Sequence, residues 1–309
     1  MRDTTGQLLQ LLRAQGDTVS GETLSADLGL SRTAVWKQIR KLQELGYAIA
    51  ASAKGYRLDG SPDTPLPWEF PGRQETVHYF PEVASTMDIA RKMARAGCAP
   101  FTVVVADRQT HGRGRLQRQW HSEAGGLYFT VVLRPVLPLL MSPRVSFCAA
   151  LALARTLQRL CGVAAALKWP NDILVKERKL AGMLSEMEAE ADRITYVNVG
   201  IGLNVNNDPA GAGVAATSLS EILGRPVSRV RLLAEFLDAL EARLASIEKT
   251  DVIAEWKAHT VTLGRRVEIV TQRATVAGRA VDVDDNGSLI LQLDDGSQQT
   301  VIYGDCFHL

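Results

Sequence analysis

The spacing of apolar residues changes twice along this chain of 309 residues, and that change constrains its fold most strongly. Helical spacing dominates up to residue 46, strand-like and helical stretches alternate from Val77, and short β runs follow Leu263. A segment with four prolines, SPDTPLPWEFPG, separates the first two patterns. We therefore predict an α/β multidomain chain with domains at residues 1–62, 77–262 and 263–309 and a linker at 63–76.

The N-terminal region has the pattern of three short helices and a hairpin. Residues 5–15 place leucines at helical spacing, and GETLSADLG follows as a second helix. Ser31 is a good N-cap for a third helix, SRTAVWKQIRKLQELG, whose predicted buried stripe is Val35, Ile39, Leu42 and Leu45. YAIAASAKGYRL then alternates around a glycine, as a small hairpin does. Together these elements resemble a winged helix-turn-helix.

A winged helix-turn-helix places its third helix in the major groove of DNA. The predicted contacts of this helix are Ser31, Arg32, Thr33, Lys37 and Gln38, and Lys54 and Arg57 on the wing would meet phosphate. Lysine plus arginine (35) nearly balances aspartate plus glutamate (34), so DNA binding has to rest on this local patch. A helical protein-interaction module with a solvated basic face is the alternative.

The central region predicts a mixed α/β domain. Residues 102–107, 127–133 and 196–205 have the apolar character of strands. Residues 146–160 are apolar on nearly all faces of a helix and predict a buried one, whereas 231–247 predict an amphipathic helix.

The tail at residues 263–309 consists of short β runs separated by DDNG and DDG turns. Such turns favour hairpins. The tail therefore predicts a small SH3-like β-barrel.

Cysteine usage and hydropathy exclude several classes of protein. The four cysteines are far apart and form no C-x-x-C pair, which argues against a metal cluster or a disulfide scaffold. The N-terminus lacks the pattern of a signal sequence, and no segment approaches about 18 uninterrupted apolar residues. We therefore expect a cytoplasmic protein with no membrane partner.

The stretch GRGRLQRQW, residues 112–120, combines three arginines with two glycines and ends in a tryptophan. Glycine lets main-chain N–H groups approach an anion closely, so the stretch indicates a loop that binds phosphate or carboxylate. Taken alone, it fits a solvated basic loop equally well. No Ser–His or Cys–His arrangement suited to nucleophilic catalysis is evident in the chain.

A family resemblance rests on four stretches in a fixed order: EVASTMDIA, DRQTHGRGRLQRQW, LKWPNDILVKERKLAGMLSE and VGIGLNVN. Preceded by a winged helix and followed by a small β domain, they resemble bifunctional biotin protein ligases of the biotin operon repressor type over nearly the whole chain. The matching elements are the glycine/arginine loop, K-W-P-N-D at 168–172, K-L-A-G at 179–182, and G-x-G-x-N at Gly200, Gly202 and Asn204.

The resemblance implies a two-step reaction. Biotin and ATP condense to biotinyl-5′-adenylate and pyrophosphate, with Mg²⁺, and a lysine of the biotin carboxyl carrier protein, an acetyl-CoA carboxylase subunit, then takes the biotin as an amide. It also implies a ligand-promoted homodimer that binds operator DNA and represses biotin synthesis genes. Joining a carboxylate to a polyphosphate requires cations, and the candidates are Arg113, Arg115, Arg118, Lys168 and Lys179.

The resemblance further implies roles for single residues. Lys179, Arg113 and Arg115 form the expected catalytic set, in which Lys179 contacts the reacting carboxylate and the α-phosphate. The expected biotin-binding residues are Ser85, Thr86, Met87, Gln109, Arg113, Gly114, Arg115, Lys179 and Gly182. The expected nucleotide-binding residues are Arg118, Trp120, Lys168, Asn171, Asp172 and Asn204, with Asp172 as a ligand of Mg²⁺. For Trp120, a place in the core is an equal alternative.

The chain departs from the family pattern at three positions. Met87 replaces an asparagine, and Leu116 and Gln117 stand where arginine and glycine are common. We expect a lost polar contact to biotin and a less cationic, stiffer loop, with the reaction retained because the three arginines remain. The alternatives are a ligase with a vestigial winged helix, a catalytically silent biotin sensor, and a lipoate ligase, which has a similar core.

Overall fold

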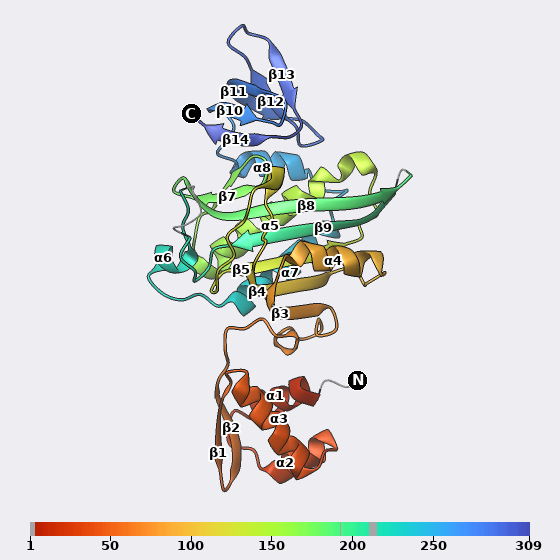
Figure 1. The fold of residues 1–309 in the computed structure, drawn as a ribbon, viewed down its shortest axis with the longest axis vertical. Helices are drawn as coiled ribbons and strands as arrows, with labels where there is room; N and C mark the ends of the chain where they lie inside the picture. Colours follow the sequence, from red (N-terminus) through yellow and green to blue (C-terminus); the bar gives the residue numbers. More distant parts are fainter. Residues whose placement is uncertain (1–3, 192, 210–214) are drawn as a thin grey trace. The chain divides into compact units, whose positions relative to one another are not determined.

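The computed structural model describes residues 4–191, 193–209 and 215–309 and divides into two compact units, Met1–Glu75 and Thr76–Leu309 (Figure 1). The first unit is mainly helical, and the second combines a mixed α/β domain with a small β domain. The predicted α/β multidomain architecture is therefore confirmed. None of the described helices combines the length and the apolar character needed to cross a bilayer.

The first unit contains the predicted three helices and hairpin. The elements are α1 (Thr4–Gln15), α2 (Gly21–Leu28), α3 (Arg32–Glu44) and the antiparallel strands β1 (Ala48–Ser52) and β2 (Gly55–Gly60). The Ser31 hydroxyl accepts a hydrogen bond from the Ala34 N–H at 3.2 Å, and such an N-cap contributes about 1 kcal/mol. The stripe of α3 that packs inward is fully buried at Val35, Ile39 and Leu42.

The proline-rich segment predicted as a linker packs on the first unit. Leu66 and Phe70 are buried on either side of a short 3₁₀ helix, η1 (Pro67–Glu69). The Glu69 carboxylate accepts two hydrogen bonds from the Arg13 guanidinium, at 2.8 and 2.9 Å. Burying two large apolar side chains removes them from water, so the segment is part of the folded unit in spite of its prolines.

The second unit is built on a seven-stranded sheet with the order β3-β4-β5-β9-β8-β7-β6, in which only β3 and β4 are parallel. Its elements are β3 (Val77–Val83), α4 (Thr86–Arg95), β4 (Thr102–Gln109), η2 (Arg115–Gln117), β5 (Leu127–Leu133), η3 (Leu139–Met141), α5 (Pro143–Cys161), β6 (Ala166–Lys168), β7 (Asp172–Val175), β8 (Arg178–Glu190), β9 (Arg193–Leu203), α6 (Leu219–Leu223), α7 (Arg229–Leu244) and α8 (Val252–His259).

Helices cover both faces of this sheet (Figure 1). Helix α4 packs its Ala90 and Ala94 against Val104 and Val132. On the opposite face, Phe129 of β5 meets Phe236 of α7 edge to face, with ring centroids 5.3 Å apart. The two predicted helices correspond to α5, which is buried over most of its length, and to α7, which ends three residues earlier than expected.

The C-terminal part is an antiparallel sheet of five strands with the order β13-β12-β11-β10-β14. The strands are β10 (Arg266–Val270), β11 (Thr275–Val283), β12 (Leu289–Gln292), β13 (Gln298–Val301) and β14 (Asp305–His308). Strands β13 and β14 lie at its two edges, so the described pairing does not close the predicted barrel. Trp169 of the central domain donates its indole N–H to the Gly287 carbonyl of this part at 3.0 Å, and its backbone N–H to Thr262 Oγ1, which immediately precedes this part, at 2.9 Å.

Candidate functional site

The residues predicted to bind ligand come from the four stretches of sequence named above and line one cavity of about 660 Å³ in the second unit. This volume is typical of a site for a small molecule. The cavity-lining residues expected from the sequence are Ser85, Thr86, Met87, Gln109, Arg113, Gly114, Arg115, Arg118, Trp120, Lys168, Asn171, Asp172, Lys179, Gly182 and Asn204. The sequence analysis missed the contribution of strand β14, which lines the cavity with Asp305, Cys306, Phe307 and His308.

Glycines on neighbouring strands make room for two large side chains of the cavity. Side chains alternate along a strand, so Gly200 and Gly202 of β9 face the same side of the sheet. A Cβ added at Gly200 would lie 2.6 Å from Met87 Sδ, and one at Gly202 would overlap the Trp120 ring. Gly182, which pairs with Gly202, likewise faces the Trp120 ring. Trp120 therefore belongs to the cavity wall.

One end of the cavity combines a fixed polar corner with apolar surface. The Thr86 backbone N–H and hydroxyl both donate to Gln109 Oε1, at 2.8 and 3.1 Å, and Gln109 Nε2 donates to Ser122 Oγ at 2.9 Å. Ser85 Oγ is buried and has no hydrogen-bond partner among the described residues. Met87 is also buried, and it adds a thioether beside these groups. This end suits a ligand with few polar atoms and an apolar chain.

Three cations of the cavity form ion pairs with carboxylates of the chain. The shortest distances are 3.1 Å from Arg113 Nη1 to Glu186 Oε1, 2.7 Å from Lys179 Nζ to Asp172 Oδ1, and 2.7 Å from Arg118 Nη2 to Asp305 Oδ2. Lys179 Nζ also lies 5.3 Å from the centroid of the Trp120 ring. An anionic ligand would therefore bind beside positive charges that these carboxylates already hold in place.

Arg115 differs from these cations because no carboxylate of the described residues forms an ion pair with it. Its Nη1 donates to the Gly304 carbonyl at 3.2 Å. Burial lowers the pKa of the guanidinium, and the nearby Asp305 and Asp172 oppose that shift. Arginine stays protonated near neutral pH even so, which leaves a desolvated positive charge beside the cavity.

Buried and half-buried polar side chains line another wall. Asn204 Oδ1 accepts a hydrogen bond from Asn207 Nδ2 at 3.0 Å, and the Asn171 side-chain amide donates to the Met183 carbonyl. Burial raises the pKa of the Cys306 thiol to about 11, so this cysteine is protonated and unsuited to act as a nucleophile. Burial, with Lys168 nearby, lowers the pKa of His308, which favours a neutral imidazole.

The glycine/arginine loop has a strained backbone at one of its unusual positions. Leu116 adopts φ 49° and ψ 41°, in the left-handed region that non-glycine residues seldom occupy. The side chain of Gln117 lies outside what the structure describes.

No group of three or more His, Cys, Asp or Glu side chains suited to a metal ion occurs among the described residues. Asp172 is nevertheless compatible with Mg²⁺, because this ion commonly takes one or two carboxylates and completes its shell with substrate phosphates and water.

The predicted DNA-binding residues do not all lie on one surface of α3. Arg32, Thr33 and Lys37 are exposed, whereas Gln38 Oε1 accepts a hydrogen bond from Thr5 Oγ1 at 2.8 Å and is thereby directed towards α1. The Ser31 hydroxyl is engaged as the N-cap. On the wing, Lys54 is exposed, and Arg57 Nε pairs with Asp59 Oδ1 at 2.7 Å.

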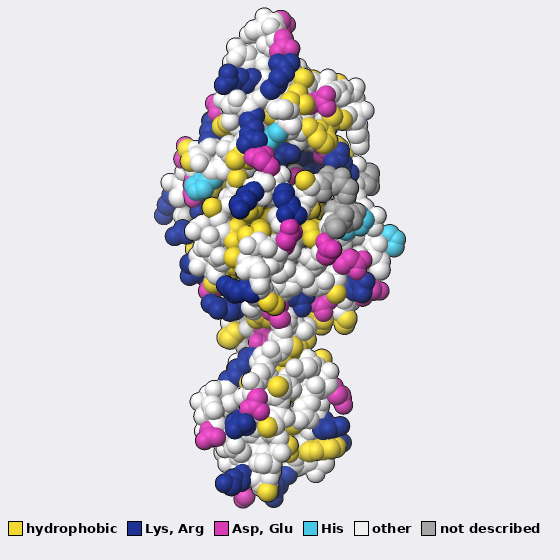
Figure 2. Space-filling model, turned by 90° about the vertical axis from the view of Figure 1, so that its left-hand side faces the viewer, with side chains coloured by type: hydrophobic (Ala, Val, Ile, Leu, Met, Phe, Trp, Pro, Cys, Tyr) yellow, Lys and Arg dark blue, Asp and Glu magenta, His cyan; other side chains and the backbone are white. Residues whose placement is uncertain are grey.

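Trp36 is the residue of α3 that the sequence analysis missed. Trp36 is 51% exposed, on the same helix as the exposed Arg32 and Lys37. A tryptophan outside the buried stripe of an amphipathic helix is the signal that could have identified it. On the face drawn in Figure 2, basic and acidic side chains are interspersed, so a local surface such as this one has to provide any affinity for a polyanion.

Comparisons with known proteins agree with this geometry. The chain matches the Biotin/lipoate A/B protein ligase family over residues 79–206, an HTH domain over 5–57 and the Biotin protein ligase C terminal domain over 262–309. The bifunctional ligase/repressor BirA of Bacillus subtilis is 35% identical over 315 residues, which cover 96% of each chain. The solved structure of the biotin protein ligase from Aquifex aeolicus in complex with biotin and ATP has a TM-score of 0.64 at 28% identity and covers 76% of this chain and 99% of that one.

A winged helix joined to a ligase domain with a cationic cavity defines the class of bifunctional ligases that carry their own DNA-binding domain. The chain belongs to the biotin protein ligase family, in its ligase/repressor branch, which confirms the resemblance inferred from the motifs.

Proposed function

We propose that this protein joins biotin to ATP as biotinyl-5′-adenylate and then transfers the biotin to a lysine of a biotin carboxyl carrier protein. The observation that carries the proposal is one cavity that combines a polar and apolar end, at Thr86, Gln109 and Met87, with a cationic wall. Biotin has an uncharged ureido ring and an apolar chain that match the first end. The adenylate carries negative charge, which the cationic wall would neutralise.

In the first step, an oxygen of the biotin carboxylate attacks the α-phosphorus of ATP, and the bond to the bridging oxygen breaks to release pyrophosphate. Both partners are anions, so their approach requires positive charge. We assign this role to Lys179, Arg113 and Arg115, with Arg118 and Lys168 towards the phosphates. These groups would accelerate the step by positioning and charge stabilisation.

In the second step, the ε-amine of the carrier lysine attacks the acyl carbon, the acyl–phosphate bond breaks, AMP leaves, and the amine loses a proton. The incoming amine is the nucleophile, so the step needs no nucleophilic side chain from this protein. The protonated state of the buried Cys306 thiol is consistent with that assignment.

Asp172 would hold Mg²⁺ together with the phosphates of ATP, and the ion would supply further charge neutralisation there. Because ATP and the carrier protein are intracellular reactants, we place the protein in the cytoplasm.

We further propose that the first unit binds operator DNA as part of a ligand-promoted homodimer. One support is the set of exposed basic side chains on α3. The other is strand β8, which pairs with β9 along one edge and with β7 along the other edge only up to Gly182. After Gly182 this second edge has no strand partner in the described part of the chain. Such an edge is a natural place for a second copy to pair. A dimer would present two copies of α3 to two half-sites of the operator.

Transfer of labelled biotin tests the ligase assignment. The full chain is mixed with ATP, Mg²⁺, labelled biotin and a biotin carboxyl carrier domain, and the carrier lysine is expected to become labelled. Lipoate in place of biotin, with a lipoyl domain as acceptor, is the matched comparison. Labelling of the lipoyl domain alone would assign the protein to the lipoate ligases, and labelling of neither would contradict the proposal.

A further inference from the structure

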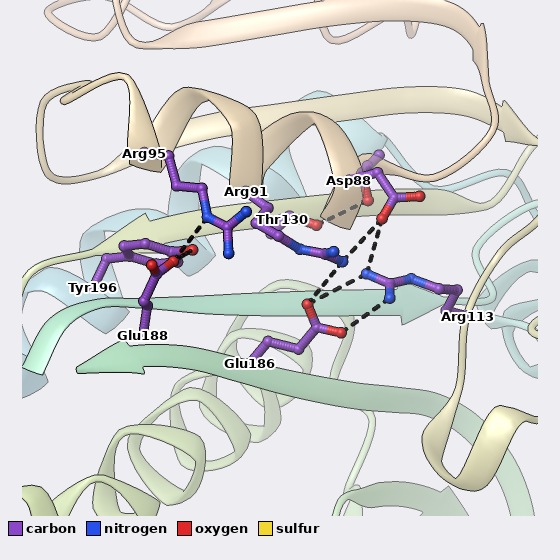
Figure 3. A network of polar contacts seen from close by, with 9 residues as sticks. Asp88, Arg91, Arg95, Arg113, Thr130, Glu186, Glu188 and Tyr196 are labelled. Carbon is purple, nitrogen blue, oxygen red and sulfur yellow. Dashed lines mark hydrogen bonds and ion pairs between the residues drawn. The ribbon is translucent and has the colours of Figure 1, made fainter. Parts of the chain in front are cut away.

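Four charged side chains beside the cavity form a closed ring in which the signs alternate (Figure 3). Arg91 Nη2 lies 3.0 Å from Asp88 Oδ1 and 3.2 Å from Glu186 Oε2. Arg113 Nη2 lies 3.2 Å from the same Asp88 oxygen, and Arg113 Nη1 lies 3.1 Å from Glu186 Oε1. Each cation thus contacts both anions, which makes the ring a network rather than two isolated pairs.

The ring joins three parts of the second unit that are distant in sequence. Asp88 and Arg91 lie in the first two turns of α4, Glu186 lies on β8, and Arg113 belongs to the glycine/arginine loop. Arg113 and the first residues of α4 also line the cavity, whereas Glu186 does not. The ring therefore lies at the edge of the cavity, which it reaches through Arg113, and it connects the loop to α4 and β8.

We propose that Glu186 and Asp88 act as positioning residues, which hold the loop closed over the cavity through Arg113 and so set how long the activated intermediate stays bound. Arg91 supports both carboxylates from α4. Within the described residues, Nε of Arg113 is buried without a hydrogen-bond partner, and the ring engages its two Nη atoms. The ring thereby fixes the guanidinium of a residue that also lines the cavity. The consequence for the intermediate rests on the proposed ligase function.

The exposure of the ring limits how strongly it can act. The four side chains are between 33% and 45% exposed, so salt and water weaken their attraction. A linked set of charges with matched geometry is worth more than a single surface pair. We therefore expect loss of the Glu186 carboxylate to change the rate at which the intermediate is released about threefold to tenfold, while the protein still folds.

Strand β8 offers a matched control two residues further on. Glu188 also pairs with an arginine of α4, since its Oε2 lies 2.9 Å from Arg95 Nε, and it accepts a hydrogen bond from Tyr196 (Figure 3). It therefore tethers β8 to α4 as Glu186 does. Among the described residues it forms no hydrogen bond or ion pair with the loop.

Limited digestion with trypsin tests the closure itself, because trypsin cleaves after arginine and the loop contains three of them. The full chain, without added biotin or ATP, is compared as wild type, Glu186→Gln, Asp88→Asn and Glu188→Gln, with thermal melts to verify folding. Cleavage after Arg113, Arg115 and Arg118, identified by mass, is expected to accelerate about threefold or more in the first two variants and to match wild type in Glu188→Gln. Equal loop cleavage in Glu186→Gln and Glu188→Gln would overturn the proposal.

The second measurement follows the intermediate. Protein loaded with labelled biotin and ATP is chased with unlabelled biotin, and the loss of bound label is timed. Glu186→Gln is expected to release label about threefold to tenfold faster, and high salt is expected to move wild type towards the variant. An unchanged release rate would overturn the link to retention. If wild type binds no label, the ligase assignment fails, while the digestion result still decides whether the ring holds the loop.

Discussion

The glycine/arginine loop of the second unit and helix α3 of the first unit are both basic, but their charges are arranged in opposite ways. In the loop, Arg113 and Arg118 are held by carboxylates from distant strands and from α4. On α3, the exposed Arg32, Lys37 and Arg40 form no ion pair with other described residues. A small anion gains from cations that are already fixed in place, whereas a polyanion such as DNA gains from mobile surface cations that release its counterions. The loop therefore suits a small ligand whose position has to be fixed, whereas α3 suits a polyanion that is bound mainly through charge.

Removing a fixed cation should have the largest effect. Lys179→Gln is expected to slow formation of the adenylate about 100-fold or more, because a charge that stabilises the reacting groups is lost inside the cavity. Release of pyrophosphate with biotin and ATP measures the change. Lys176→Gln, an exposed lysine three residues earlier, is the control and should stay within about twofold of wild type. Equal losses of rate in the two variants would show that Lys179 has no specific role in forming the adenylate.

The second-largest expected effect is the difference in salt dependence between DNA binding by α3 and adenylate formation in the cavity. If three or four phosphates are contacted, DNA affinity is expected to fall about 50- to 150-fold between about 0.05 and 0.2 M salt. The rate of adenylate formation should change by less than about threefold, because Arg113 and Lys179 are partly buried and already paired and Arg115 is largely shielded from solvent. Gel shifts on operator DNA and pyrophosphate release, measured in the same buffers, provide the comparison. A flat salt dependence of DNA binding would contradict the role given to α3.

Trp36 tests whether α3 contributes more than charge. Trp36→Ala is expected to weaken operator binding about 5- to 20-fold, since an exposed aromatic side chain on a groove-binding helix can pack on thymine methyl groups or sugars. Trp36→Phe should retain most of the affinity, and both variants should form adenylate at the wild-type rate. A loss that is the same on non-operator DNA would point to general affinity instead of sequence preference.

Asp305 should give the smallest effect. Its partner Arg118 is 54% exposed at the side chain, so Asp305→Asn is expected to raise KM for ATP only about twofold to fivefold. Asp294→Asn is the control, because Asp294 pairs with Arg266 in the same sheet but does not line the cavity. An effect near that of Lys179→Gln would mean that strand β14 takes part in the chemistry itself.

Local pattern was sufficient for the elements and for much of the site. Apolar spacing placed α3, the hydroxyl of Ser31 marked its N-cap, and the resemblance carried by the four motifs implied most of the residues that line the cavity. Pattern failed where a side chain has a partner far away in the sequence. Gln38 faces Thr5 across 33 residues, and Leu66 and Phe70 are buried within a segment whose prolines predicted a linker.

Some missed features had a local signal. Glu186 and Glu188 are two residues apart on β8, and Arg91 and Arg95 are four residues apart on α4. Each pair therefore lies on one face of its element. That pattern indicates a charged face on a strand and another on a helix. It does not say that the two faces meet, which depends on how α4 packs on the sheet.

The amino-acid sequence by itself determined the order of the domains, the amphipathic helices and the motif residues, because backbone propensity and alternating burial are properties of neighbouring residues. Tertiary structure alone decided that β14 completes the cavity, that Gly200 and Gly202 make room for Met87 and Trp120, and that Arg113 is held by Asp88 and Glu186. Contacts of a few ångströms between distant residues arise only when strand register and helix packing are set, and no local pattern encodes either.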